Sequence, residues 1–177
     1  MNKIIKKLLN AVGIDTRKKI TLVHYPDKRL SQRCKEVERF DDDLLHAAQA
    51  MVNLLGMLPW GTPLGLAANQ AGLNIRMFIK RESVKGKPGY VAYVNPAIIW
   101  KTKAPEVESL EGCYSLVPGR FDYPNMRTPS IQLEWQDLEG NFYRDRFNGE
   151  EAIVIQHELD HLNGILCNGS GRAVSGT

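Results

Sequence analysis

The feature that most limits how this chain can fold is a helix predicted over residues 150–162. It begins with acidic residues, which the N-terminus of a helix favours, and it ends at Asn163-Gly164. His157 and His161 are four residues apart, so both imidazoles project from one helix face and can bind the same ion. Glu158 directly follows the first histidine and can reach a water on that ion. This pattern is typical of metal-assisted hydrolysis, in which a cation acidifies a water and a carboxylate carries its proton.

A hydrolytic metal site of this kind needs a third protein ligand, and the spacing alone leaves two candidates. Downstream, Cys167 stands where the spacing of the metzincin proteases would place a third histidine. Upstream, Cys113 lies in a short segment that also contains Gly112. Cys34 has no partner motif, and we expect it to be a structural thiol. A further alternative is that the chain is not an enzyme but a structural or degenerate metal-binding module.

Composition fits one globular domain rather than a fibrous, membrane or disulfide-rich protein. The chain has 177 residues, of which 43% are hydrophobic and 24% charged. A net charge of only +3 does not indicate sequence-specific binding to nucleic acid. No apolar run has the length of a transmembrane segment. Three scattered cysteines favour a reducing compartment, so we expect a cytoplasmic protein.

The remaining patterns predict an α+β fold with mixed or antiparallel sheets packed around the helix that carries the histidines. A helix is expected over 41–55 and a loop over 59–65. Alternating or β-branched segments predict strands at 20–25, 75–80, 90–94 and 98–102, the second and third of these being joined by a polar loop at 82–89. A hairpin is expected from 131–135 and 142–147.

The two ends of the chain differ from the single domain expected over 20–168. Residues 1–19 form a basic segment, with apolar residues at helical spacing over 3–12 and six cations, Lys3, Lys6, Lys7, Arg17, Lys18 and Lys19. We expect a short helix on the domain surface; contact with a membrane surface or the ribosome, and organelle targeting, are the alternatives. Residues 169–177 are small and polar, which predicts a flexible tail.

Three segments resemble the motifs of peptide deformylases, and they occur in that family's order. Gly65-Leu66-Ala67-Ala68-Asn69-Gln70 resembles the G-x-A-A-x-Q motif, and Glu111-Gly112-Cys113-Tyr114-Ser115 resembles E-G-C-x-S. Gln156-His157-Glu158-Leu159-Asp160-His161-Leu162 resembles Q-H-E-x-D-H-L. The resemblance covers about residues 20–167, and it implies a hydrolase that removes the N-formyl group from the N-terminal methionine of nascent polypeptides and releases formate.

The resemblance also implies a role for each motif residue. Cys113, His157 and His161 become the metal ligands, and Glu158 becomes the general base and later the acid. The side-chain amide of Gln70 and the backbone N–H of Tyr114 become the donors that stabilise the developing negative charge. The family implies one divalent ion per chain, natively Fe²⁺, with Ni²⁺ or Zn²⁺ also able to occupy the site. It also implies a bacterial or bacterial-like host. The ligand types alone would favour Zn²⁺.

The same resemblance suggests how a formyl-Met peptide binds. Gly65 carries no side chain, so a peptide backbone can approach it and pair with the segment from Leu64 to Leu66. Ile153 and Val154 lie one turn before His157 and would line an apolar pocket for the methionine side chain. Glu111 and Arg120 complete the expected substrate site, with Glu111 also able to support the ligands.

Three departures from the family pattern concern the pocket rim and the ends. Pro63 stands where the family usually has glycine, and the path from Cys113 to Pro118 is one residue longer than usual. The family's long C-terminal helix is not expected, since the chain ends soon after Cys167. In the ribosome-contact alternative for residues 1–19, the basic N-terminal segment would take the place of that helix.

Overall fold

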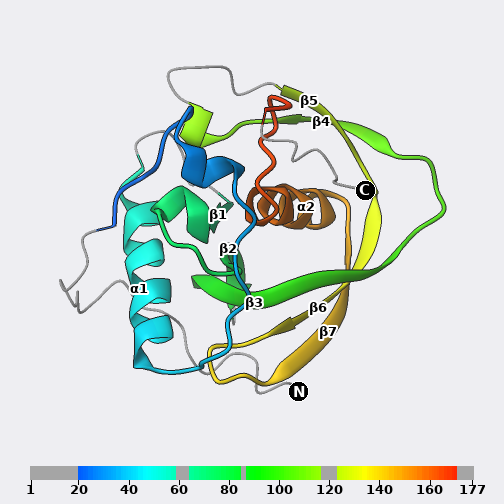
Figure 1. The fold of residues 1–177 in the computed structure, drawn as a ribbon. Helices are drawn as coiled ribbons and strands as arrows, with labels where there is room; N and C mark the ends of the chain where they lie inside the picture. Colours follow the sequence, from blue (N-terminus) through cyan, green and yellow to red (C-terminus); the bar gives the residue numbers. More distant parts are fainter. Residues whose placement is uncertain (1–19, 59–63, 85–86, 117–122, 171–177) are drawn as a thin grey trace, which may run out of the picture.

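The fold is built on a five-stranded antiparallel sheet. The computed structural model describes residues 20–58, 64–84, 87–116 and 123–170. The sheet has the order β1-β2-β3-β6-β7, and a separate two-stranded sheet pairs β4 with β5 (Figure 1). The strands are β1 Gly65–Ala67, β2 Met77–Val84, β3 Lys87–Lys101, β4 Val107–Glu111, β5 Tyr123–Arg127, β6 Ser130–Gln136 and β7 Phe142–Asn148. Every pair of neighbouring strands is antiparallel, which confirms the predicted α+β class.

The two helices pack on opposite faces of the large sheet. Successive side chains of a strand point to opposite faces. Met77 and Ile79 of β2 accordingly join a core cluster with α1 (Asp42–Gly56), whereas Phe78 joins a second cluster with α2 (Glu150–Leu162). Because α2 carries the histidine pair, the second cluster fixes the position of the candidate site.

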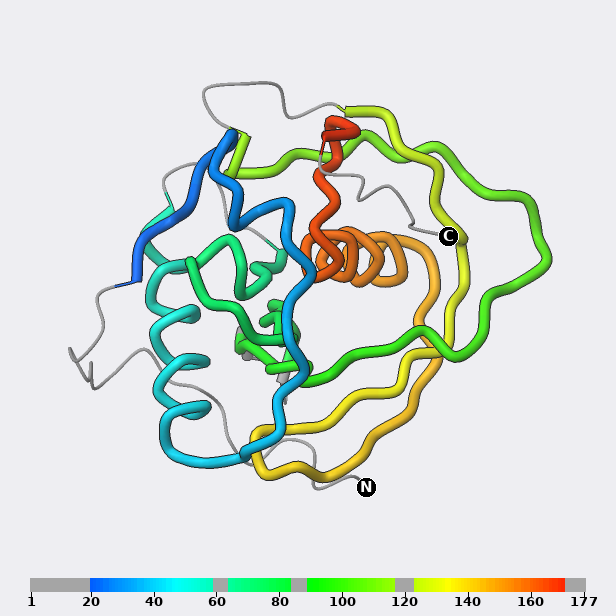
Figure 2. The backbone as a smooth tube through the Cα atoms, in the orientation of Figure 1, coloured from blue at the N-terminus to red at the C-terminus, as the bar shows by residue number. Residues whose placement is uncertain are grey.

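Helix α2 lies near the centre of the fold, with the strands curving around it (Figure 2). The pairing of β3 with β6 shifts register twice, between Val94 and Ala97 and between Ile98 and Trp100. Such irregularities bend a strand and increase its twist. β3 therefore leaves the flat part of the sheet, and the chain returns past α2 through β4 and β5 (Figure 2).

Helix α1 has a well-defined start. The side chain of Asp41 accepts hydrogen bonds from the backbone N–H groups of Asp43 and Leu44, at 3.1 and 3.2 Å. Acidic residues in the first turn favour the helix dipole. The prediction over 41–55 is confirmed, with the buried face formed by Leu44, Ala48, Met51, Val52, Leu54 and Leu55.

Several strand predictions were wrong in detail. The expected strand at 20–25 is an extended segment with isolated backbone hydrogen bonds. Val23 N–H donates to the Gln70 carbonyl (2.7 Å), and Tyr25 N–H donates to the Ser115 carbonyl (2.8 Å). The expected strands 90–94 and 98–102 form one strand, β3, and the polar loop expected at 82–89 is shorter because β2 and β3 extend into it. Neither β4 nor β5 was predicted.

Three short 3₁₀ turns complete the described elements: η2 at Lys28–Ser31, η3 at Ala68–Ala71 and η4 at Tyr114–Leu116. Among the described residues, the helices are all too short or too polar to cross a membrane. The basic segment 1–19, Pro63, Pro118, Arg120 and residues 171–177 of the expected tail lie outside the described ranges.

Candidate metal centre

Helix α2 positions three chemically active side chains by burying its opposite face. Ala152, Ile155, Leu159 and Leu162 pack into the core against the sheet. Since these residues fix the rotation of the helix, His157, Glu158 and His161 turn toward β1 and the loop after β4. His161 is 1% exposed and Glu158 is 3% exposed, so both polar groups are shielded from bulk water.

Three side chains bring potential ligand atoms together at this point. The Nε2 atoms of His157 and His161 are 3.1 Å apart, and Cys113 Sγ lies 3.3 Å from His161 Nε2. All three ligand atoms lie within 4.8 Å of one another. A cation bound to nitrogen at about 2.0–2.1 Å and to sulfur at about 2.3 Å holds tetrahedral donors roughly 3–4 Å apart, so this spacing fits one ion.

The chemistry of the donor set also fits a divalent transition metal. Burial and the neighbouring His157 lower the pKa of His161 well below its ordinary value, which keeps the imidazole neutral and able to bind a metal. Contact with Cys167 and burial raise the pKa of the Cys113 thiol, and a bound cation opposes both effects because it favours the thiolate. Two imidazoles and one thiolate suit Zn²⁺, Fe²⁺ or Ni²⁺.

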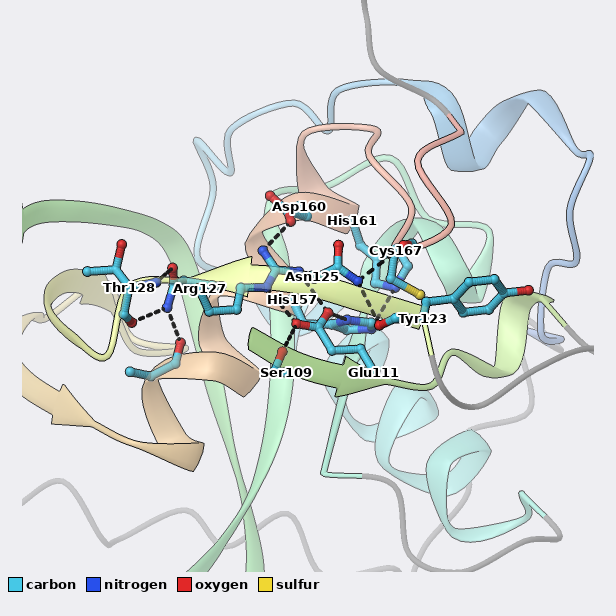
Figure 3. Close-up of polar contacts among 12 residues, drawn as sticks. Ser109, Glu111, Tyr123, Asn125, Arg127, Thr128, His157, Asp160, His161 and Cys167 are labelled. Atoms are coloured by element: carbon cyan, nitrogen blue, oxygen red, sulfur yellow. Dashed lines mark hydrogen bonds and ion pairs between the residues drawn. The ribbon is translucent and has the colours of Figure 1, made fainter. Parts of the chain in front are cut away.

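A buried carboxylate orients the first histidine. Glu111 Oε2 accepts a hydrogen bond from His157 Nδ1 at 2.8 Å, which leaves the Nε2 lone pair directed at the site. Arg127 holds the same carboxylate through two further bonds, Nε to Oε1 at 2.6 Å and Nη2 to Oε2 at 2.8 Å. Ser109 Oγ donates to Oε1 at 2.7 Å, and Arg127 Nη1 reaches Asp160 Oδ2 at 2.5 Å (Figure 3).

The contacts around Glu111 shift the pKa values of Glu111 and His157 in opposite directions. Burial alone would raise the pKa of Glu111, but the hydrogen bonds from Arg127, His157 and Ser109 outweigh it and hold that pKa far below its usual range. Burial would lower the pKa of His157, but Glu111 and Glu158 together raise it. Glu111 is therefore an anion that supports His157, besides lining the adjacent cavity as expected of a substrate-site residue.

Gln70 links β1 to the cysteine loop. Its side-chain oxygen accepts from the Ala67 N–H at 2.9 Å, which fixes the orientation of the amide. Its Nε2 then points to Cys113 Sγ at 3.3 Å and to Ser115 Oγ at 3.2 Å. The amide nitrogen is thus a preoriented donor beside the three potential ligand atoms.

Glu158 lies between α2 and β1, and its Oε2 atom is buried with no hydrogen-bond partner among the described residues. Burial raises the pKa of this carboxyl to about 7, despite the opposing effect of His157. A Cβ atom added to Gly65 would lie 2.8 Å from Glu158 Cδ, so only glycine leaves room for this carboxylate. Sequence reasoning attributed Gly65 to the peptide; the structure adds its contact with Glu158.

A cavity of about 370 Å³ opens beside these groups. Its wall is largely apolar, with Ile153 and Val154 half-buried on α2 and Leu66 buried on β1. Leu64 is 42% exposed and lies at the rim. Tyr114 lines the cavity together with Gln70, Glu158, His157 and Cys113. The expected site residues inside the described ranges thus share one cavity, except for His161, which lies buried behind its wall. Arg120 lies outside those ranges.

Cys167 lies beside Cys113 in a small buried cluster with Val23, Leu30 and Leu166. Among the described residues, the group whose ligand atoms converge contains Cys113 and not Cys167. The geometry therefore favours the upstream cysteine over the metzincin-like alternative.

Sequence reasoning missed Arg127 and Ser109. Both lie on strands that were not predicted, and Arg127 belongs to a five-residue strand, Tyr123–Arg127, with a proline inside it. A single arginine in such a segment carries no local signal that distinguishes it from a surface residue.

Comparison with known proteins gives a consistent result. A family profile described as polypeptide deformylase matches residues 19–170. A curated peptide deformylase of Borreliella burgdorferi is 34% identical over 145 residues, which is 82% of this chain and 83% of the relative.

Solved structures give the same family. The crystal structure of peptide deformylase from Thermotoga maritima is 30% identical, with a TM-score of 0.73, and covers 84% of this chain and 95% of that chain. A peptide deformylase from Synechococcus elongatus in complex with actinonin has a TM-score of 0.73 and 29% identity, and covers 85% of this chain and 78% of that chain.

Proposed function

This chain belongs to the peptide deformylase family, and we propose that it removes the N-formyl group from the N-terminal methionine of nascent polypeptides. The reaction is hydrolysis of a linear amide, and its products are formate and a free N-terminal amine. The observation that carries the proposal is the convergence of Cys113, His157 and His161 beside the buried Glu158, at an apolar cavity lined by Cys113, His157 and Glu158.

The proposed ligands of one divalent ion are Cys113, His157 and His161. When bound, the ion lowers the pKa of a water and polarises the formyl carbonyl. We propose Fe²⁺ as the native ion, with Ni²⁺ and Zn²⁺ as substitutes. Glu111 keeps the His157 ring in the binding tautomer, and Arg127 keeps Glu111 in place.

Glu158 is proposed as the proton carrier. A carboxyl whose pKa is about 7 accepts a proton from the attacking water and returns it near neutral pH. The receiving atom is the amine nitrogen of the departing peptide, which must be protonated as the amide bond breaks. The position of Glu158 in the cavity wall, next to His157, supports both transfers.

Gln70 and Tyr114 are proposed to stabilise the negative charge that grows on the formyl oxygen. The Gln70 amide is held by Ala67 and directed at the Cys113 loop, so it needs little reorganisation during the reaction. Tyr114 directly follows Cys113, and its backbone N–H is the second proposed donor.

The peptide is proposed to add a strand beside β1. β1 is the terminal strand of its sheet and pairs with β2 along one side. A peptide along the other side would place its first side chain against Ile153, Val154 and Leu66. An unbranched apolar side chain such as that of methionine suits this wall.

We further propose a cytoplasmic site of action and contact between the basic residues 1–19 and the ribosome. The supporting observation is the excess of cations in that segment, which would bind phosphate without sequence preference. Deletion of residues 1–19 should weaken co-sedimentation with ribosomes at low salt; unchanged co-sedimentation would contradict the contact.

The test of the central proposal is turnover of formyl-Met-Ala-Ser by protein purified without oxygen, with metal content measured on the same sample. We expect about one metal ion per chain and release of formate. Glu158→Ala should retain the metal and lose a factor of roughly 10² or more in turnover. Full turnover in Glu158→Ala would remove the proposed proton carrier, and no turnover in metal-loaded wild type would contradict the function.

A further inference from the structure

Glu150 is an unpaired carboxylate in the wall of the substrate cavity. It is the first residue of α2, and it is exposed. The described residues that line the cavity include the carboxylates Glu111, Glu150 and Glu158 but neither lysine nor arginine. Glu111 is neutralised by Arg127, and Glu158 lies beside the ligands. Within the described part of the chain, the side chain of Glu150 makes no hydrogen bond or ion pair.

The neighbouring residue explains why Glu150 faces the cavity. Glu151 Oε1 lies 3.3 Å from the Nζ atom of Lys80, a side chain 5% exposed on β2. Adjacent helix residues are about 100° apart around the axis, so the tie between Glu151 and the sheet turns Glu150 to a different side. Ile153, Val154 and His157 follow Glu150 at spacings of three, four and seven, which places all four on one helix face.

Lys80 does not neutralise the cavity wall. Its ammonium group also binds Glu82 Oε1 at 3.2 Å, so it is shared between two carboxylates outside the cavity lining. The described part of the cavity lining therefore carries a net negative charge at the end formed by the start of α2.

The length of α2 sets which part of a peptide meets this charge. A helix rises about 1.5 Å per residue, so Glu150 lies about 10 Å along the axis from His157. In the binding mode proposed above, the first side chain of the peptide occupies the wall between them. In an extended peptide, the first and third side chains point the same way, about 7 Å apart. A peptide that runs from His157 toward the start of α2 thus brings its third side chain next to Glu150.

We propose that Glu150 makes this enzyme prefer nascent chains with lysine or arginine as the third residue over those with aspartate or glutamate. The inference rests on the proposed function, because it assigns a specificity to the same cavity. A cation there gains attraction to Glu150, and an acidic side chain is repelled. An acidic residue in the first turn also stabilises a helix, so the test must separate specificity from that structural role.

The experiment compares C-terminally amidated peptides that differ in the position of one charge. Formyl-Met-Ala-Lys and formyl-Met-Ala-Glu test the third residue, and formyl-Met-Lys-Ala with formyl-Met-Glu-Ala tests the second. At low ionic strength we expect kcat/KM to favour lysine over glutamate at the third residue by about three- to tenfold. Salt near 0.5 M should remove most of the difference, since it screens exposed charges.

Two substitutions of Glu150 separate a role in substrate specificity from a role in helix stability. Glu150→Gln should reduce the ratio for the third residue to within about twofold of unity, and Glu150→Lys should invert it. Asp42→Asn is the matched control, because it removes an exposed first-turn charge from α1, outside the cavity lining, and should keep the wild-type ratio. Dissociation constants of acetyl-Met-Ala-Lys-amide and acetyl-Met-Ala-Glu-amide should show the same order without any turnover.

The outcomes distinguish this inference from the function on which it rests. Turnover of all four peptides with equal kcat/KM at the third residue would overturn the role of Glu150 and leave the function intact. Discrimination that persists in Glu150→Gln, or that appears only at the second residue, would also overturn it. Failure of every formylated peptide in metal-loaded enzyme would instead contradict the function.

Discussion

Gly65 and Glu158 touch across the gap between β1 and α2, and this contact determines where the carboxylate sits. Gly65→Ala would bring a methyl group 2.8 Å from Glu158 Cδ, so the carboxylate must move. Because a shift of about 1 Å in a reacting group costs up to roughly 10² in rate, we expect kcat to fall by about tenfold or more with the metal content unchanged. Steady-state kinetics and metal analysis check this.

A second glycine provides the control for that variant. A Cβ atom at Gly56, the last residue of α1, would meet no other atom within 4 Å. Gly56→Ala should leave kcat unchanged and raise the free energy of unfolding by up to about 1 kcal/mol, since alanine favours the helix. Equal kcat in Gly65→Ala and wild type would show that Glu158 does not depend on the glycine.

The two neighbouring cysteines should differ sharply in their importance for metal. Cys113 Sγ lies 3.3 Å from His161 Nε2, whereas Cys167 is outside the converging group of described residues. Cys113→Ala should abolish stoichiometric metal, and Cys167→Ala should retain metal and most activity. Metal analysis of the two purified variants decides between them, and the reverse pattern would support the metzincin-like site.

At the scale of single residues, the sequence predicts the site best where the spacing of residues along one helix already determines their relative positions. His157, Glu158 and His161 lie on one helix, so their spacing alone predicts that they share a site. Cys113 and Gln70 come from distant segments, 43 residues apart, and only the family resemblance brought them together. Arg127 belongs to no motif, and its role depends on a strand pairing that has no local pattern.

At the scale of elements, Arg127 joins three of them. It lies on β5, binds Glu111 on β4 and reaches Asp160 on α2, with 8% of its side chain exposed. Arg127→Ala would leave Glu111 buried without its main cation, which should lower the free energy of unfolding by about 3–5 kcal/mol. Metal affinity should also fall by about 10–100-fold, because Glu111 orients His157. Denaturant titration and metal competition measure the two effects.

An exposed ion pair on the large sheet provides the comparison. Arg144 binds Glu134 at 2.6 Å between β7 and β6, but the arginine side chain is 58% exposed. Arg144→Ala should therefore change the free energy of unfolding by about 0–1 kcal/mol and leave metal affinity unaltered. Similar losses in both arginine variants would contradict the importance of burial for the Arg127 network.

The sequence predicted those helices and strands in which one face is buried, because their apolar residues then recur at a regular spacing. β6 alternates buried and half-buried residues over Ser130–Gln136, and α1 has a continuous apolar face. β4 and β5 each bury one residue, and in both strands that residue is charged, Glu111 and Arg127, so they lack the apolar alternation that marks a strand. The segment at 20–25 has an apolar pattern, but its backbone bonds go to Gln70 and Ser115, which lie on different turns and offer no continuous strand edge.

At the scale of the whole molecule, a bound ion would connect parts of the fold that are distant in the chain. Cys113 follows β4, and both histidines belong to α2. Free metal at about 1,000 times the dissociation constant should stabilise the folded protein by about 4 kcal/mol. For a chain of this size, chelation should then lower Tm by about 8–16 °C. Thermal unfolding with and without chelator tests this; Cys113→Ala should show no such shift, and an unchanged wild-type Tm would contradict the site.

The order of α2 in the chain has a consequence for how the protein is made. α2 follows every strand against which it packs, and the carbonyl of His161 receives a hydrogen bond from Asn69, 92 residues earlier. During synthesis from the N-terminus, the apolar face of the sheet around Phe78 and Tyr93 therefore stays uncovered until α2 has been made. Folding cannot be completed by adding elements one at a time as they emerge. An enzyme that acts on unfinished proteins gains its own active site only when α2 has left the ribosome.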